Sequence, residues 1–307
     1  MNFEVPILLL TFNRPDNVRK QISFLNLIKP NSLYIFSDGP RLSNNSDKDK
    51  IKKIRTTLKD SINWECNVKF KFEETNLGCG PGVSEAITWF FLNEEEGIII
   101  EDDCFLSEDF FEFAKEMLNI YRNDNKIAGI TADYKLENSK TSNYGFIEYP
   151  LIWGWATWRR AWEGYSLTLD DYDKDNLPKK ILEFNKNQKK YWLDNFDKIK
   201  KSKKPHTWDF QYSYLVLSRD QLFIHPCTNL VTNIGFDSEA THTKSKYNKF
   251  AFLKTGKLDK PYKLITRENE YNNYLSKEFF IRKSPIFKVF EKLKVYFYFI
   301  KKFFHRL

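Results

Sequence analysis

Short apolar runs alternate with amphipathic stretches over the first hundred residues of the chain. Four apolar runs predict β-strands, at residues 5–12, 33–37, 68–72 and 97–101. The amphipathic stretches between them predict three helices, over residues 16–27, 47–58 and 81–92. Asp16 and Asp47 are candidate N-caps of the first two helices, and Pro81 suits the first turn of the third. This alternation predicts an α/β fold with a mostly parallel central sheet flanked by helices.

The pattern becomes less regular in the second half of the chain. Apolar positions at helical spacing predict a helix from Ser107 to Tyr121, and residues 127–131 predict a further strand. An aromatic block occupies residues 153–162, and the lysine-rich stretch 170–204 that follows predicts helical segments on the surface. We therefore expect one catalytic domain and a tail, divided at residues 1–275 (halves at about 1–135 and 136–275) and 276–307.

The tail has a composition of its own. Residues 284–307 alternate Phe, Tyr, Ile and Val with Lys, and six apolar positions share one face of a predicted helix. The longest apolar run, residues 295–300, is too short to span a bilayer. Basic and aromatic residues together favour an amphipathic C-terminal helix in the membrane interface, with packing on the domain as the alternative. We expect peripheral contact at the inner face of the cytoplasmic membrane.

Composition and charge exclude several classes of protein. Hydrophobic residues at 41% and aromatic residues at 17% exclude a disordered or fibrous chain. The net charge is +8, but nine Lys and Arg against Glu278 and Glu291 in residues 277–307 account for a surplus of seven. The rest of the chain is nearly neutral overall, which argues against a nucleic-acid enzyme. The four cysteines form no CxxC pair, and the N-terminus lacks the features of a signal peptide, so we expect reduced thiols in the cytoplasm.

Polar residues follow three of the predicted strands, where ligands of parallel sheets bind. Eight residues at these strand ends and in the loop at residues 74–82 are candidates for contact with a donor, meaning the substrate that supplies the transferred group. They are Thr11, Asn13, Arg14, Asp38, Asn76, Gly78, Glu101 and Asp102. The triplet of Glu101, Asp102 and Asp103 ends an apolar strand. Carboxylate oxygens suit Mn²⁺ or Mg²⁺ shared with substrate phosphates, and the alternative is a solvated acidic turn before the helix at Glu108.

At these positions the sequence resembles the fold-type A (GT-A) glycosyltransferases, among them the N-acetylglucosaminyltransferase I family and bacterial surface-polysaccharide sugar transferases. The resemblance runs with gaps from residue 5 to residue 242, and residues 98–103 followed by residues 109–113 carry it most specifically. It implies a GT-A nucleotide-diphospho-sugar transferase fold. It also implies that Arg14 touches the nucleotide, that Asp38 reads the uracil and that Asp103 binds the metal.

The resemblance implies further roles in the second half. Glu101 and Asp102 would face ribose or metal-bound water, and Trp153, Gly154 and Trp155 would lie beside the sugar, although tryptophans are more often core residues. Asp209 would be the catalytic base, with helix capping as the alternative. The family has two adjacent aspartates there, whereas Phe210 follows Asp209, so either the base is displaced by one position or it lies elsewhere. His242 would be a late contact to metal or diphosphate.

These expectations amount to a metal-dependent inverting glycosyltransferase. It would move a sugar, with N-acetylglucosamine as a candidate, from a UDP-sugar to a glycan or lipid-linked acceptor of a bacterial surface polysaccharide. One alternative is a sugar-phosphate nucleotidyltransferase, which the absence of glycine from residues 11–15 disfavours. The other is a non-catalytic carbohydrate-binding protein of the same fold.

Overall fold

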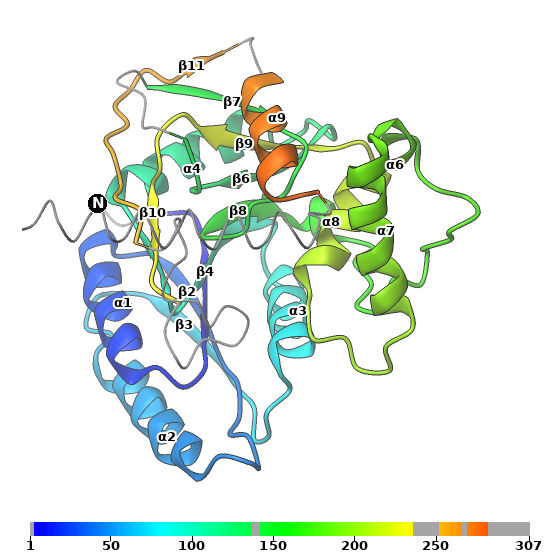
Figure 1. Cartoon of the computed structure of the whole chain (residues 1–307). Helices are drawn as coiled ribbons and strands as arrows, with labels where there is room; N and C mark the ends of the chain where they lie inside the picture. The colour runs from blue at the N-terminus through cyan, green and yellow to red at the C-terminus, as the bar shows by residue number, and fades with distance from the viewer. Residues whose placement is uncertain (1–2, 137–141, 236–251, 266–268, 282–307) are drawn as a thin grey trace, which may run out of the picture.

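A large mixed sheet runs through the protein, as a computed structural model describes it for residues 3–136, 142–235, 252–265 and 269–281 (Figure 1). The strands of the first half are β1 (Ile7–Thr11), β2 (Ser32–Ser37), β3 (Asn67–Phe72), β4 (Glu96–Glu101), β5 (Cys104–Leu106) and β6 (Ile127–Thr131). Those of the second half are β7 (Asn143–Ile147), β8 (Trp155–Trp158), β9 (Leu222–Pro226), β10 (Val231–Asn233) and β11 (Lys263–Leu264). Within the described residues, the main sheet has the order β11-β7-β9-β6-β8-β4-β1-β2-β3, and β5 pairs with β10 separately.

Helices cover both faces of this sheet. They are α1 (Pro15–Ile28), α2 (Asn45–Asp60), α3 (Cys79–Phe91), α4 (Glu108–Ile120), α5 (Arg159–Trp162), α6 (Lys179–Glu183), α7 (Lys186–Lys200), α8 (Asp209–Ser218) and α9 (Asn269–Glu278). Side chains of β1 alternate between the faces, so Ile7 and Leu9 pack with α1, α2 and α4, and Leu8 and Leu10 pack with α3, α5 and α8. The predicted α/β architecture is confirmed.

The register of the first four strands brings the polar strand ends together. β1 lies between β2 and β4, and all three are parallel. Thr11 pairs with Ser37, and Leu10 pairs with Glu101. The three predicted clusters of polar residues therefore meet at one edge of the sheet.

The second half of the sheet is mixed rather than parallel. The aromatic block forms β8, which is inserted antiparallel between β4 and β6. β7 is antiparallel to β9, while β9 is parallel to β6. The sheet is therefore parallel in the half that carries the acidic triplet and mixed beyond it, and parallel pairs predominate in the sheet as a whole.

Two predicted helix caps are wrong. Pro15 opens α1 and Arg14 is its N-cap residue, so Asp16 lies inside the first turn. The N-cap of α2 is Asn44, whose side chain accepts a hydrogen bond from the Ser46 N–H. Asp47 is fully buried inside α2 instead. Pro81 lies in the first turn of α3, as expected.

The predicted boundary at residue 275 falls inside α9, which packs on the domain through Tyr271 and Leu275. Phe280, in the first part of the predicted tail, stacks on Tyr149 and Trp192. The membrane-helix prediction concerns residues 282–307, which lie outside the described residues. Among the helices that are described, none has the length and apolar character needed to cross a bilayer.

Candidate functional site

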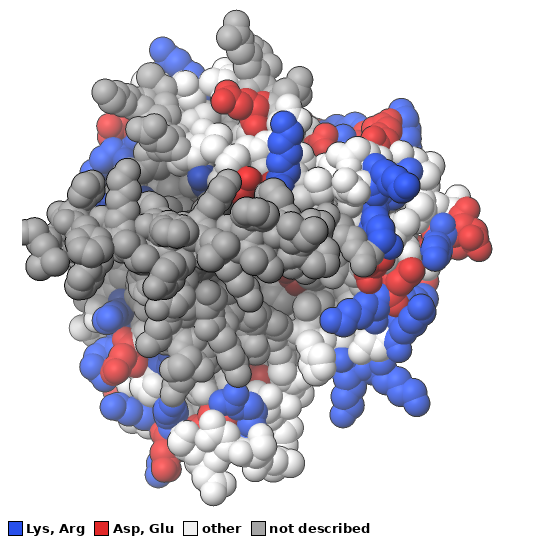
Figure 2. All heavy atoms as spheres, in the orientation of Figure 1, with Lys and Arg blue, Asp and Glu red and all other residues white. Residues whose placement is uncertain are grey.

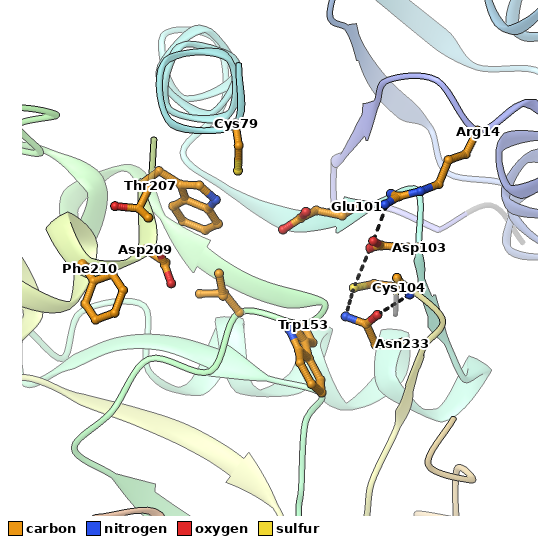
Figure 3. Close-up of a pocket in the computed structure, with 13 residues that line it drawn as sticks. Arg14, Cys79, Glu101, Asp103, Cys104, Trp153, Thr207, Asp209, Phe210 and Asn233 are labelled. Carbon is orange, nitrogen blue, oxygen red and sulfur yellow. Dashed lines mark hydrogen bonds and ion pairs between the residues drawn. The ribbon is translucent and has the colours of Figure 1, made fainter. Parts of the chain in front are cut away.

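Two adjoining cavities lie at the edge of the sheet where β1, β2 and β4 end. The larger has a volume of about 340 Å³ and is lined by Arg14, Cys79, Glu101, Asp103, Cys104, Ile152, Trp153, Thr207, Trp208, Asp209, Phe210, Asn233 and Gly235 (Figure 3). The smaller has a volume of about 140 Å³ and is lined by Leu10, Thr11, Phe12, Arg14, Phe36, Asp38, Arg41, Asn76, Gly78, Cys79, Gly82, Val83, Glu101 and Asp102. Arg14, Cys79 and Glu101 line both, so the two cavities meet at these three side chains.

Arg14 neutralises part of the acidic triplet. Its Nη1 donates to Asp102 Oδ1 at 2.7 Å and to Asp103 Oδ2 at 3.0 Å. The other oxygen of Asp102 accepts a hydrogen bond from the Phe12 N–H at 3.1 Å, and the residue is only 4% exposed. Asp102 therefore fastens the loop after β1 to the end of β4. The alternative of a solvated acidic turn is wrong, because the triplet is buried or half-buried.

Glu101 and Asp103 are the members of the triplet that face the larger cavity. Within the described residues, the Glu101 carboxylate accepts no hydrogen bond and forms no ion pair. Burial raises the pKa of Glu101, and repulsion from Asp103 and Asp102 raises it further. A cation placed beside these oxygens would offset that repulsion.

The carboxylates of this cavity fit a Mg²⁺ or Mn²⁺ ion that is shared with substrate phosphates better than an ion held by protein side chains alone. In the described part of the chain, no three His, Cys, Asp or Glu side chains are grouped closely enough to hold a metal by themselves. Mg²⁺ is usually bound through one or two carboxylates together with substrate phosphates. Asp103 and Glu101 supply that number of carboxylates at a cavity wall. His242, predicted as a further ligand, lies outside the described residues.

Asp209 lines the opposite side of the larger cavity from Glu101 (Figure 3). It is the first residue of α8, and Trp208 is the N-cap residue without a side-chain capping bond. The N-terminus of a helix stabilises a negative charge, and Asp209 is an acidic residue in the first turn of α8. The thiol of Cys79 lines the same cavity, and its pKa is raised by burial and by the charges of Glu101 and Asp209. Carboxylates therefore face one another across a cavity of small-molecule size.

The three residues around Gly154 divide between cavity and core. Trp153 lines the larger cavity, and Lys135 Nζ lies 3.8 Å from the centre of its ring. Trp155 is 1% exposed and stacks on Trp208 in the core. Gly154 has a φ of +66° and does not line either cavity. The prediction that all three lie beside a sugar is therefore wrong for Gly154 and Trp155.

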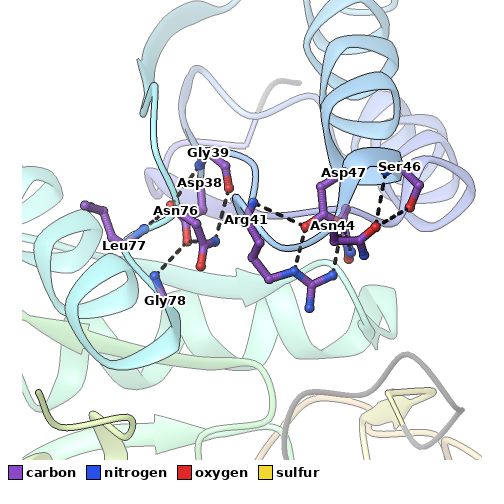
Figure 4. A network of polar contacts seen from close by, with 10 residues as sticks. Asp38, Gly39, Arg41, Asn44, Ser46, Asp47, Asn76, Leu77 and Gly78 are labelled. Atoms are coloured by element: carbon purple, nitrogen blue, oxygen red, sulfur yellow. Dashed lines mark hydrogen bonds and ion pairs between the residues drawn. The ribbon is translucent and has the colours of Figure 1, made fainter.

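Asp38 organises a loop at the end of β2 (Figure 4). Its two oxygens accept hydrogen bonds from the backbone N–H groups of Gly39, Leu77 and Gly78 and from the side chain of Asn76, at 2.8 to 3.1 Å. Burial raises its pKa, and the backbone donors oppose that shift. These four hydrogen bonds already occupy the carboxylate. Asp38 therefore has no free acceptor with which to read the uracil base, as the resemblance had implied. Asp38, Asn76 and Gly78 still line the smaller cavity.

A second network joins the loops after β1 and β2 (Figure 4). Arg41 donates to Asp47 through Nε at 2.6 Å and through Nη2 at 2.9 Å. The Asn13 amide donates to the same carboxylate at 2.9 Å. Burial alone would raise the pKa of Asp47, but the hydrogen bonds from Arg41 and Asn13 lower it below its usual value. Asn13 thus supports the loop and does not line either cavity, contrary to the prediction of donor contact.

Arg41 and Phe12 form one wall of the smaller cavity. The guanidinium carbon of Arg41 lies 5.1 Å from the centre of the Phe12 ring. Thr11 lines the same cavity, but its hydroxyl donates to the Phe36 carbonyl at 2.9 Å. A flat aromatic ring held beside a guanidinium group is a surface on which a nucleobase can stack.

Several lining residues were not predicted. Phe12, Arg41, Cys79 and Thr207 line the cavities but were not named as site residues, whereas Asn233 belongs to the segment 233–237, which is part of the resemblance to bacterial sugar transferases. Phe12 and Cys79 directly neighbour predicted site residues in sequence, and Thr207 lies two residues before Asp209, which is the one signal that could have identified them. Arg41 has no such signal, because its position depends on the fold of the β2–α2 loop.

Comparisons with known proteins give little beyond this geometry. No family model and no curated protein matches the chain. Among solved structures, a UDP-glucose pyrophosphorylase complexed with UDP-glucose is similar over 72% of this chain and 90% of that chain, at 10% sequence identity and a TM-score of 0.35. A similarity of this size is too distant to assign an activity, and the two cavities remain the basis for a function.

Proposed function

We propose that the protein is a metal-dependent glycosyltransferase that uses a nucleoside diphosphate sugar, with a UDP-sugar as the expected donor. One observation carries this proposal. The acidic end of β4 and the N-terminus of α8 present Glu101, Asp103 and Asp209 to one cavity, which continues into a second cavity bounded by Phe12 and Arg41. A two-part ligand with a charged centre fits this arrangement.

The donor would span both cavities. In this proposal the nucleobase and ribose occupy the smaller cavity, where Phe12 and Arg41 offer a stacking surface. The diphosphate lies at the junction, where Arg14 supplies positive charge. The sugar extends into the larger cavity toward Trp153, which lines that cavity and whose ring can contact the apolar face of a pyranose.

Asp103, with Glu101 beside it, would hold a Mn²⁺ or Mg²⁺ ion. Such an ion stabilises the charge on a departing diphosphate. The chain itself contributes the orientation of the carboxylates. Arg14 fixes Asp103 from one side, and the Ile234 N–H donates to the Asp103 carbonyl oxygen at 2.9 Å from the other.

Asp209 would act as the general base. In an inverting transfer, the acceptor hydroxyl attacks the anomeric carbon from the face opposite the diphosphate. The hydroxyl proton passes to the Asp209 carboxylate, the bond from the sugar to the diphosphate breaks, and the nucleoside diphosphate leaves. Asp209 lies across the cavity from the triplet, which is the side from which such an attack must come (Figure 3).

A screen of nucleotide sugars with Mn²⁺ tests this proposal by the release of nucleoside diphosphate. We expect release with at least one UDP-sugar, and a loss of roughly a hundredfold or more in Asp209→Asn. Asp60→Asn is the matched control, because Asp60 is exposed at the end of α2. Equal activity of Asp209→Asn and Asp60→Asn would remove Asp209 from the mechanism. Tight UDP binding without turnover of any donor would favour the non-catalytic carbohydrate-binding protein.

A nucleotidyltransferase is the second candidate, and one observation favours it. Two guanidinium groups, those of Arg14 and Arg41, line the smaller cavity, and such groups bind phosphates well. The products distinguish the two reactions. Pyrophosphate release from a nucleoside triphosphate and a sugar 1-phosphate would establish the nucleotidyltransferase and overturn glycosyl transfer.

A further inference from the structure

A lysine-rich surface covers α6, α7 and the loop that leads to α8. Residues 179–204 contain ten lysines against Glu183, Asp194 and Asp197, which leaves a surplus of seven positive charges. Lys and Arg side chains gather over α6, α7 and the following loop on the right of Figure 2. The near neutrality expected for the catalytic domain is therefore a balance between regions, and this region is strongly basic.

The helical spacing of α7 directs these charges outward. Its buried residues are Gln188, Trp192, Phe196 and Ile199, which share one face. Lys186, Lys190 and Lys201 lie on the opposite face by the 3.6-residue period. All three are exposed. Asp194 and Asp197 share this face but pair with Lys190 and Lys174, so Lys186 and Lys201 are the lysines that the face presents without an acidic partner among the described residues.

Most of these lysines are not neutralised within the described part of the chain. Lys179, Lys180 and Lys190 pair with Glu183, Glu148 and Asp194 respectively. Six others form no ion pair with a described carboxylate, namely Lys186, Lys189, Lys198, Lys201, Lys203 and Lys204. The positive charge is therefore available to an external partner.

The chemistry of the surface favours a lipid headgroup layer over a nucleic acid. The basic residues of this region are all lysine, which acts as a point charge and lacks the planar fork with which arginine reads bases. The aromatic side chains of α7 face inward, with Trp192 and Phe196 fully buried. No aromatic platform for base stacking therefore accompanies the charges in the described residues of this surface. Anionic lipids attract clustered lysines without either feature.

The position of the surface relates it to the larger cavity. Five lysines lie between Lys198 and Lys204 without an intervening acidic residue. Pro205 is buried, and its carbonyl oxygen lies close to Gly80 at the start of α3. Thr207, which follows within three residues, already lines the cavity. A partner bound to the lysines is thus held close to the wall that carries Asp209.

We propose that the surface formed by α7 and residues 201–204 docks on an anionic lipid bilayer. Docking itself does not depend on the proposed function. Its consequence does, because it would present a membrane-held acceptor to the wall of the larger cavity. The attraction is electrostatic, so it weakens as salt shortens the Debye length.

Vesicle sedimentation with the full chain tests this proposal. The probes are phosphatidylcholine vesicles with and without phosphatidylserine, at low and high salt. The test variant combines Lys198→Glu, Lys201→Glu, Lys203→Glu and Lys204→Glu. The matched control combines Lys20→Glu, Lys48→Glu, Lys52→Glu and Lys53→Glu, which are exposed lysines of α1 and α2 with the same total charge change.

We expect wild type and control to bind the anionic vesicles, and the test variant to partition at least about tenfold less. Thermal denaturation of both variants checks folding, and a version of the test set with Gln at the four positions should lose part of the binding.

Two results overturn the proposal. Either the test variant binds as wild type does, which assigns the binding to another part of the chain, or test and control lose binding equally. Loss of oligonucleotide binding with vesicle binding retained would identify a nucleic-acid surface instead. None of these results requires turnover, so failure here is distinguishable from failure of the proposed function.

Discussion

The guanidinium group of Arg14 lies 3.0 Å from the carboxylate of Asp103, at the point where the two cavities meet. Both side chains are largely buried, since 17% of the Arg14 side chain and 14% of the Asp103 side chain are exposed. Arg14 is therefore the positive partner of the triplet within the described residues, and any cation that binds Asp103 shares this carboxylate with it. In the proposed mechanism, Arg14 and the cation would compete for Asp103 when no nucleotide is bound and would both favour the binding of a diphosphate.

This relationship predicts opposite effects of Arg14→Gln on two ligands. Removing the guanidinium charge lowers the repulsion against a divalent ion, so Mn²⁺ alone should bind roughly tenfold more tightly. UDP should bind more weakly, because a phosphate contact is lost. Separate titrations with Mn²⁺ and with UDP measure both effects. Weaker Mn²⁺ binding in this variant would show that Arg14 does not oppose the ion.

The bidentate pair of Arg41 and Asp47 predicts a cost in stability. Arg41→Met leaves a fully buried carboxylate with Asn13 as its remaining side-chain donor. We expect a loss of about 1 to 3 kcal/mol in the free energy of unfolding, measured by urea denaturation. Arg19→Met is the control, because the pair of Arg19 and Asp16 is exposed and contributes about 0 to 1 kcal/mol. Equal losses in the two variants would contradict the structural role of Asp47.

Two glycines with positive φ provide a matched test of packing around Leu106. A Cβ at Gly154 would lie 2.3 Å from Leu106 Cδ2, whereas a Cβ at Gly78 would meet nothing within 4 Å. Both substitutions to Ala strain the backbone, but only Gly154→Ala adds a clash. Gly154→Ala should therefore be more destabilising by at least about 1 kcal/mol in thermal or urea unfolding. A smaller penalty for Gly154→Ala in a Leu106→Ala background would confirm the cause.

His225 predicts a pH dependence of stability with a definite sign. It is 2% exposed and packs against Tyr134 and Tyr271, and burial lowers its pKa to about 4. The unfolded chain, with a histidine pKa of about 6.5, binds more protons between these values. Stability should therefore fall as the pH drops from about 6.5 to 4, by about 3 kcal/mol from this residue.

His225→Gln removes this contribution. The unfolding free energy of the variant should depend less on pH than that of wild type over the same window, and His206→Gln, at an exposed position, should not change the slope. Urea unfolding at a series of pH values compares the three proteins. Parallel curves for wild type and His225→Gln would indicate that the imidazole is protonated in the folded state.

The first half of the fold could be predicted because its periodicity is local. Alternating apolar residues in β1 serve the two faces of one sheet, and parallel strands bring their carboxyl ends to one edge. The cluster of polar strand ends followed from that rule alone. The insertion of β8 between β4 and β6 could not be predicted, because strand order depends on packing between distant segments.

Site residues could be predicted where a carboxylate follows a buried strand of the sheet. Glu101 and Asp103 end a buried strand, and both line the larger cavity. Trp153 and Trp155 look alike in sequence, and residues two apart would share one side of a regular strand. One faces the cavity and the other the core, because Gly154 between them has a φ of +66° and interrupts the strand geometry before β8 begins at Trp155. Asp47 resembles a helix cap and is instead a buried partner of Arg41, a difference that depends on loop geometry.

The central claim is that the carboxylates at the end of β4 bind a cation together with a nucleoside diphosphate. Isothermal titration of UDP with and without Mn²⁺, in wild type and in Asp103→Asn, tests it most directly. We predict that Mn²⁺ strengthens UDP binding in wild type by tenfold or more, about 1.4 kcal/mol, and that Asp103→Asn abolishes this gain while its thermal unfolding stays cooperative. UDP binding that is absent, or that gains equally from Mn²⁺ in both proteins, would contradict the claim.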